Sequence, residues 1–166
     1  MFIEVAMSSE KDTHPEQDLT EERENQEAVD RRLSIPKGTT ILVVEDNVAN
    51  FVLIARLLGY MGVHCEWKTS GYEVMEYADG LSRLDLILMD LRLPYEDGYG
   101  ALHKIRSSPH LKDTPVVAVT AEANAEAMRK ARQAGFDGFI GKPLDADRFP
   151  EQIRRILCGD PVWEWS

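Results

Sequence analysis

The sequence predicts an α/β domain in which a five-stranded parallel sheet carries helices on both faces. Three observations predict this fold: apolar, often β-branched runs recur along the chain, helical stretches separate them, and every connection is short. The predicted strands are 39–45, 63–68, 84–89, 115–119 and 138–141. The predicted helices are 48–60, 71–78, 99–107, 124–134 and 145–157.

Three of the predicted strands are marked by nearly continuous apolar runs. Residues 39–45 are β-branched and apolar, as in a parallel strand that is buried on both faces. The run 84–89 (LDLILM) is the most apolar, and we expect it at the centre of the sheet. PVVAV at 115–119 predicts the fourth strand, whereas the second and fifth are short segments placed by the alternation with helices.

The helices are predicted from apolar residues at helical spacing. The first keeps this spacing through Phe51, Val52, Ile54, Ala55 and Leu58, and the last through Phe149, Ile153, Ile156 and Leu157. Residues 124–134 are rich in alanine, which favours a helix. Strands and helices therefore alternate from residue 39 to residue 157.

Composition limits the classes of function. The chain has 166 residues, enough for one domain and a tail, and a net charge of −10, which disfavours direct binding to nucleic acid. Two cysteines are too few for a disulfide scaffold. No apolar stretch approaches the roughly 20 residues that cross a bilayer, and the first residues lack a signal peptide pattern. We therefore expect a cytoplasmic protein without membrane insertion.

Two segments differ from the predicted domain, which spans 38–158. Residues 1–37 hold ten acidic and five basic residues and few large apolar ones, so we expect a flexible extension, with a solvated helix over about 20–33. Residues 159–166 form a tail with two tryptophans, Trp163 and Trp165. Because exposing both rings to water is unfavourable, we expect them to contact the domain, a partner or a second protomer.

Polar residues stand where the predicted strands end. Glu45 and Asp46 end the first strand, Asp90 the third, Thr120 the fourth and Lys142 the fifth. In a parallel sheet these ends meet at the ligand-binding edge. Two carboxylates about 4 Å apart repel by roughly 4 kcal/mol, so this cluster predicts a bound cation, and oxygen ligands suit Mg²⁺. A threonine hydroxyl and a lysine beside it favour an anion held next to the metal.

These segments resemble a known family, the receiver domain of two-component response regulators. The matching stretches are ILVVEDN (41–47), LILMDLRLPYEDG (86–98), PVVAVTA (115–121) and GFDGFIGKPL (135–144), in the order and spacing of that family. The resemblance covers about residues 39–158. It implies a flavodoxin-like (βα)5 fold with strand order 2-1-3-4-5, and a signalling switch rather than an enzyme.

The resemblance also assigns roles to single residues. It implies that Asp90 accepts a phosphoryl group and that Mg²⁺ is held by Asp46, Asp90 and the backbone carbonyl of Arg92, with Glu45 acting mainly through water. Lys142 matches the invariant lysine of the family motif. Thr120 matches the hydroxyl residue of the family's switch, and Phe139 matches its aromatic residue. Pro94 and Gly98 match the turn after the phosphoacceptor, and a cis peptide bond is expected before Pro143.

Two flanking residues, Arg92 and Glu122, are expected to tune the loss of phosphate. They either form a pair across the mouth of the site, which would obstruct water, or face solvent separately. The implied partners are a sensor histidine kinase or a histidine phosphotransfer protein, and a downstream protein. Two alternatives stay open: a dimerising or scaffold receiver that acts through its terminal segments, and a dehalogenase-type phosphatase, whose DxD motif is missing at Asp90-Leu91-Arg92.

Overall fold

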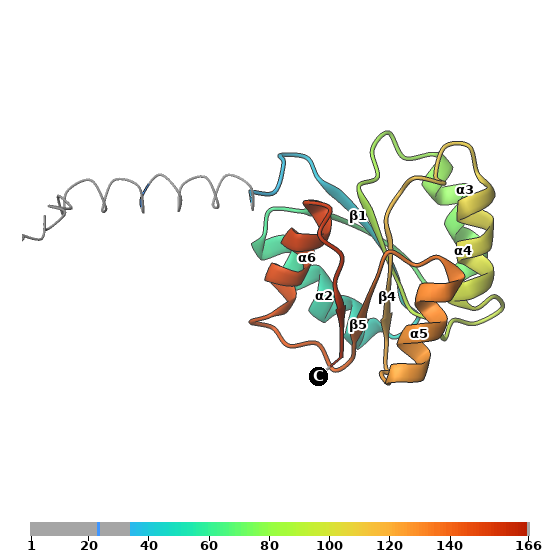
Figure 1. Ribbon diagram of the computed structural model, residues 1–166. Coiled ribbons are helices and arrows are strands. Elements are labelled where there is room, and N and C mark those ends of the chain that lie inside the picture. Colours follow the sequence, from blue (N-terminus) through green and yellow to red (C-terminus); the bar gives the residue numbers. More distant parts are fainter. Residues whose placement is uncertain (1–22, 24–33, 166) are drawn as a thin grey trace, which may run out of the picture. The chain divides into compact units, whose positions relative to one another are not determined.

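The computed structural model describes residue 23 and residues 34–165 (Figure 1). The chain divides into two units, 1–34 and 35–166, and each is considered by itself. In the first unit Arg23 is helical and exposed. Most of the predicted acidic extension, with nearly all of its expected helix, lies outside the described residues.

The second unit is built on a parallel sheet. Its strands are β1 (Thr40–Val44), β2 (His64–Lys68), β3 (Leu86–Met89), β4 (Val116–Thr120), β5 (Gly138–Gly141) and β6 (Trp163–Glu164). They lie in the order β2-β1-β3-β4-β5-β6, and each neighbouring pair is parallel. The predicted parallel sheet and the order 2-1-3-4-5 are confirmed, with β6 added at the β5 edge.

Helices cover both faces of this sheet (Figure 1). They are α2 (Val48–Tyr60), α3 (Val74–Asp79), α4 (Gly98–Ser107), α5 (Ala125–Ala134) and α6 (Phe149–Leu157), with a 3₁₀ turn, η1 (Gly71–Glu73), before α3. Helices α2 and α6 pack on one face, and α3, α4 and α5 on the other. Among the residues described, no helix is both long and apolar enough to cross a membrane.

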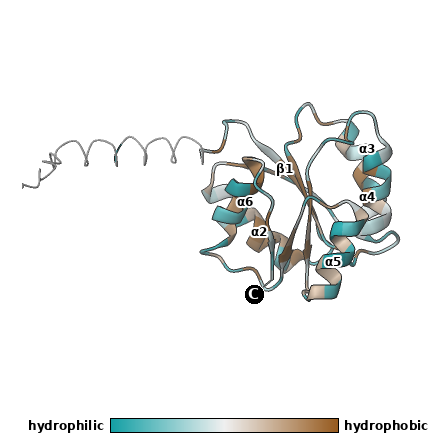
Figure 2. Ribbon diagram, viewed as in Figure 1, coloured by the Kyte–Doolittle hydropathy of each residue, from teal (hydrophilic) through white to brown (hydrophobic). Residues whose placement is uncertain are grey.

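Two apolar cores lie on either side of the sheet, and the strands between them are the most hydrophobic part of Figure 2. Alternate residues of β1 enter opposite cores: Leu42 and Val44 pack under α3–α5, and Ile41 and Val43 under α2 and α6. Every residue of β1, β3, β4 and β5 is buried. Burial on both faces explains why these strands appear in the sequence as continuous apolar runs.

The last helix begins later than predicted. The predicted helix starts at residue 145, but α6 starts at Phe149. The Asp145 carboxylate accepts hydrogen bonds from the backbone N–H groups of Asp147 and Arg148, at 2.9 and 3.2 Å. This local turn competes with helix formation, as aspartate side chains commonly do.

The strand β6 corrects the predicted number of strands from five to six. Val162 is buried, the Trp163 side chain packs against the core under α3–α5, and the Trp165 Cβ lies beside Gly141. The expected contact of the tryptophans therefore forms within the chain. A two-residue strand is too short to show a strand pattern in sequence.

Two leucines of α2 provide a matched test of the core. Leu58 is fully buried in the core under α2 and α6, whereas Leu53 is 39% exposed. We expect Leu58→Ala to lower the free energy of unfolding by about 2–5 kcal/mol, because it leaves a cavity, and Leu53→Ala by roughly 0.5 kcal/mol or less. Urea denaturation of both variants measures this difference, and equal losses would contradict the assignment of the core.

Candidate functional site

The five polar residues predicted at strand ends meet at one edge of the sheet. Glu45 and Asp46 follow β1, Asp90 follows β3, Thr120 ends β4 and Lys142 follows β5. Backbone hydrogen bonds hold these ends level: the Asp90 N–H donates to the Val44 carbonyl at 3.0 Å, and the Lys142 N–H to the Thr120 carbonyl at 2.9 Å. The sheet register alone therefore brings together residues that lie far apart in the sequence.

Lys142 lies between two carboxylates. Its Nζ donates to Asp90 Oδ2 at 2.6 Å and also to Glu45 Oε2. All three side chains are at least nine-tenths buried. Burial by itself would lower the pKa of Lys142, but the hydrogen bonds and negative charges of Asp90 and Glu45 outweigh burial and raise it. Lys142 is therefore positively charged and offsets part of the negative charge.

The acidic side chains form a cradle suited to a hard cation. Oxygen atoms of Glu45, Asp46 and Asp90 all lie within 4.8 Å of one another, and of these residues only Asp46 is exposed. Three carboxylates face one lysine, so the cluster keeps an excess of negative charge. Oxygen-only ligands with one open side fit Mg²⁺, which retains several waters. The Arg92 N–H donates to Asp90 Oδ1 at 3.0 Å, and this hydrogen bond holds the loop that follows Asp90. The metal-binding role of the Arg92 carbonyl stays a prediction.

Glu45 is oriented by contacts that the sequence did not reveal. Its Oε1 accepts from the Asn47 N–H at 3.0 Å and from Asn50 Nδ2 at 3.4 Å. Its backbone carbonyl accepts from Trp67 Nε1 at 2.8 Å, and the Trp67 ring stacks on Phe51 at 4.2 Å between centroids. Asn47 also caps α2, a local signal that the sequence does carry, whereas nothing in the sequence links Trp67 to Glu45.

Arg92 and Glu122 form an ion pair beside the cluster. Arg92 Nη2 and Nε lie 3.1 and 3.3 Å from Glu122 Oε2. The pair is joined to the buried threonine, because the Glu122 N–H donates to Thr120 Oγ1 at 3.2 Å. Of the two arrangements that the sequence left open, the paired one is present, with the Arg92 side chain largely exposed and that of Glu122 about half exposed. Its effect on phosphate loss stays a prediction.

The other motif residues occupy structural positions. Phe139 is fully buried in the core under α3–α5. A Cβ on Gly98 would lie 2.5 Å from the Asp90 carbonyl oxygen, so only glycine permits this close approach. The expected cis bond between Lys142 and Pro143 is present. The predicted site residues are thus gathered around one edge of the sheet. Phe139 is the exception, because it lies in the core under α3–α5.

Comparison with known proteins agrees with this arrangement. Residues 41–154 match the family model for the response regulator receiver domain. The histidine-protein kinase BarA of Shigella flexneri is 38% identical over 123 residues, covering 74% of this chain but only 13% of the kinase. The response regulator DivK of Brucella anthropi is 34% identical over 131 residues, covering 74% of this chain and 98% of DivK.

A solved structure shows the same relationship. The receiver domain of the sensor histidine kinase PA1611 from Pseudomonas aeruginosa, with a magnesium ion coordinated in its active-site cleft, is 33% identical and superposes with a TM-score of 0.66. The match covers 74% of this chain and 98% of that domain. The family match, the identity to relatives and the fold all agree. The chain belongs to the response regulator receiver domain family.

Proposed function

We propose that this protein is a phosphoacceptor switch in which Asp90 takes a phosphoryl group from a phosphohistidine of a kinase or phosphotransfer protein. The observation that carries this proposal is the contact of Asp90 with Lys142, at 2.6 Å, inside a cluster of two further carboxylates. A lone aspartate at a strand end has many structural uses. An aspartate held against a buried ammonium, at the ligand-binding edge of this sheet, fits an anion-transfer site.

In the proposed reaction, a carboxylate oxygen of Asp90 forms a bond to phosphorus while the bond from phosphorus to the histidine nitrogen breaks. Lys142 neutralises charge on the transferred oxygens, exchanging part of its contact with the carboxylates for the phosphoryl group. Glu45, Asp46, Asp90 and the Arg92 carbonyl would hold Mg²⁺, which supplies further charge neutralisation. Positioning and electrostatics therefore account for the chemistry, as in other phosphoryl transfers.

The switch requires several contacts to change together. Moving a two-state equilibrium from 1:99 to 99:1 needs about 5.5 kcal/mol. A hydrogen bond from Thr120 to the phosphoryl group contributes roughly 1.5–3 kcal/mol. The remainder would come from new Lys142 contacts and from repacking of Phe139, which lies on the strand next to Thr120. Water then hydrolyses the acyl phosphate and resets the domain, so the protein acts on itself rather than as an enzyme with a separate substrate.

The position of the receiver in a pathway follows from the same chemistry. A phosphorylated Asp90 either changes the affinity for a downstream protein or passes its phosphoryl group to another histidine. The second route is supported by the resemblance to receiver domains that are parts of histidine kinases, BarA and PA1611.

Replacing the acceptor tests this proposal. With Mg²⁺ and a phosphorylated histidine phosphotransfer protein, or a small-molecule phosphodonor, we expect Asp90→Asn to abolish incorporation of acid-labile phosphate. Asp113→Asn is the matched control, because Asp113 is exposed and precedes β4, at the opposite end of the sheet. Intact-protein mass spectrometry measures the incorporation, and full labelling of Asp90→Asn would refute the assignment.

The Arg92–Glu122 pair makes a separate prediction. If the pair obstructs the attacking water, Arg92→Ala should shorten the lifetime of the phosphorylated protein by roughly two- to tenfold, equal to about 0.4–1.4 kcal/mol in the barrier. Arg129→Ala, an exposed arginine on α5, serves as the control. The decay of phosphorylated protein is followed after removal of the donor, and an unchanged lifetime would show that the ion pair does not obstruct the attacking water.

A further inference from the structure

Asp46 is the exposed member of the acidic cluster, and its carboxylate is held by no side chain. Glu45 and Asp90, its buried neighbours, both bond to Lys142. Among residues 34–165, by contrast, no hydrogen bond or ion pair reaches the Asp46 side chain. The backbone that carries Asp46 therefore decides where its carboxylate lies relative to the other two.

The peptide group between Glu45 and Asp46 is held by the end of β2. The Glu45 N–H donates to the Lys68 carbonyl at 2.9 Å, and the Glu45 carbonyl accepts from Trp67 Nε1 at 2.8 Å. The first bond continues the pairing of β1 with β2, whereas the second comes from a side chain. Because the Glu45 carbonyl and the Asp46 N–H belong to one planar unit, holding the carbonyl fixes the direction in which the chain enters Asp46.

The Trp67 indole is itself held by the helix that follows Asp46. Its ring stacks on Phe51, with the ring centroids 4.2 Å apart and the planes 4° from parallel. Phe51 lies on α2, and its N–H donates to the carbonyl of Asn47, the N-cap of that helix, at 3.0 Å. The contacts form a closed loop that runs from Trp67 to the carbonyl before Asp46, along the chain into α2, and through Phe51 back to Trp67. One aromatic pair therefore fixes the chain on both sides of Asp46.

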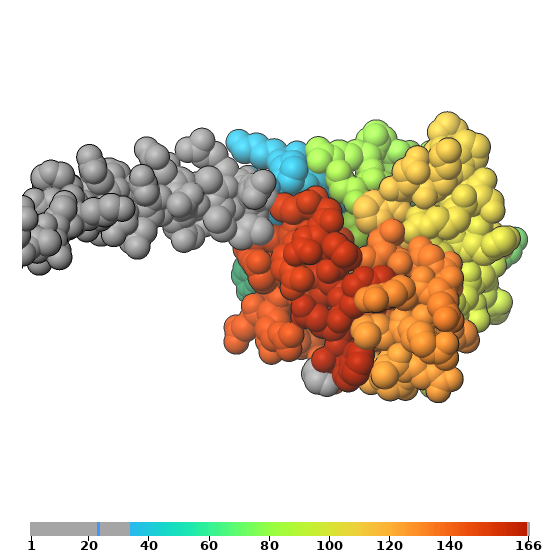
Figure 3. Space-filling view, in the orientation of Figure 1, coloured from blue at the N-terminus to red at the C-terminus, as the bar shows by residue number. Residues whose placement is uncertain are grey.

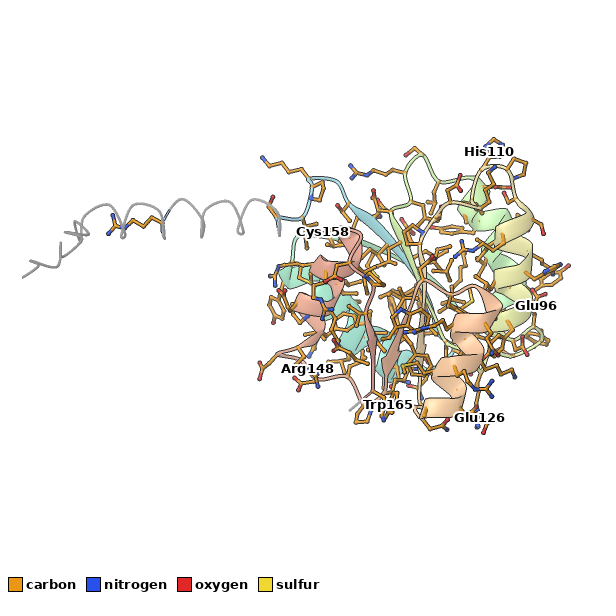
Figure 4. The ribbon with its side chains drawn as sticks, viewed as in Figure 1. Glu96, His110, Glu126, Arg148, Cys158 and Trp165 are labelled. Carbon is orange, nitrogen blue, oxygen red and sulfur yellow. The ribbon has the colours of Figure 1, made fainter. Side chains whose placement is uncertain are left out.

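The other two tryptophans of the chain belong to its C-terminal segment. Figure 3 shows this segment in deep red on the surface between α5 and α6, and Trp165 is labelled there in Figure 4. Trp163 lies on β6, which is at the opposite edge of the sheet from β2. Trp67 is thus the indole that contacts the acidic cluster, and Trp163 offers a matched control for it.

We propose that Trp67 is a positioning residue for the metal site: its indole N–H holds the Glu45 carbonyl, keeps Asp46 in place for Mg²⁺, and so raises the affinity of the acidic cluster for that ion. This inference rests on the proposed function, because it concerns the same site. A ligand side chain that is already in place loses less conformational freedom when the metal binds. Trp67 offers no ligand atom of its own, since its indole only donates, and it acts through Asp46.

Removal of the indole N–H alone tests the proposal. In the full-length chain, Trp67 is replaced by benzothienylalanine, in which sulfur takes the place of the N–H and the double ring that stacks on Phe51 is kept. Trp67→Phe is a second variant without the N–H, and Trp163→Phe is the control, because it makes the same change at the opposite edge of the sheet. MgCl₂ alone is titrated into each chain by calorimetry, and the free energy of unfolding is measured in urea without metal.

We expect the dissociation constant for Mg²⁺ to rise about three- to tenfold in both Trp67 variants, which is the effect of losing one hydrogen bond of ordinary strength. In Trp163→Phe it should change by less than about twofold. Amide hydrogen exchange of residues 45–51 without metal should be faster in the Trp67 variants alone.

A lower free energy of unfolding with an unchanged affinity for Mg²⁺ would show that Trp67 only stabilises the fold, and would overturn the proposal. An equal loss of affinity in Trp163→Phe would overturn it as well, because the effect would then not depend on the contact with Glu45. If the wild-type chain binds Mg²⁺ and the Trp67 variants bind it equally well, this inference fails and the proposed function stands. If the wild-type chain binds no Mg²⁺, both fail.

Discussion

The contact of Lys142 with Glu45 and Asp90 is the constraint on which the arrangement of this domain depends. Two buried carboxylates side by side repel each other strongly, and a fold retains them only with a compensating cation. The lysine supplies that charge from the end of another strand, and its raised pKa shows that the carboxylates more than offset its burial. The same balance leaves Asp46 and the open side of the cluster available for a metal. Structure and proposed chemistry therefore rest on one set of charges.

The sheet holds these charges in place because it is parallel and buried on both faces. Val44 pairs with Met89, and Thr120 pairs with Gly141. The site residues at the ends of these strands therefore lie at the same level along the edge of the sheet. Groups carried on strands between two packed cores are positioned more rigidly than groups on loops. The strand β5 has a second role, since its outer edge receives β6 while its end leads into Lys142. The four residues of β5 therefore contribute both to the edge of the sheet and to the placement of Lys142.

Much of the fold and most of the cluster could be predicted from sequence, because both are encoded locally. Apolar runs mark the buried strands, and the polar residue that ends each run is the one that reaches the site. Contacts between distant side chains carry no such signal: Trp67 on the Glu45 carbonyl depends on the pairing of β1 with β2. For the same reason the sequence does not decide whether Arg92 pairs with Glu122. The turn at Asp145 and the short strand β6 cannot be predicted from the sequence, because a few residues are too short to show the hydrophobic periodicity of a helix or strand.

The dependence of stability on Mg²⁺ and beryllofluoride tests the central claim, a single site that binds a metal and then a phosphoryl group. The free energy of unfolding of the wild-type protein is measured by urea denaturation without ligand, with Mg²⁺ alone, with beryllofluoride alone and with both. A ligand at about a hundred times its dissociation constant stabilises the folded state by about 2.7 kcal/mol. We predict stabilisation by Mg²⁺, and further stabilisation by beryllofluoride only when Mg²⁺ is present. No change in any buffer, or equal stabilisation by beryllofluoride without Mg²⁺, would contradict the account.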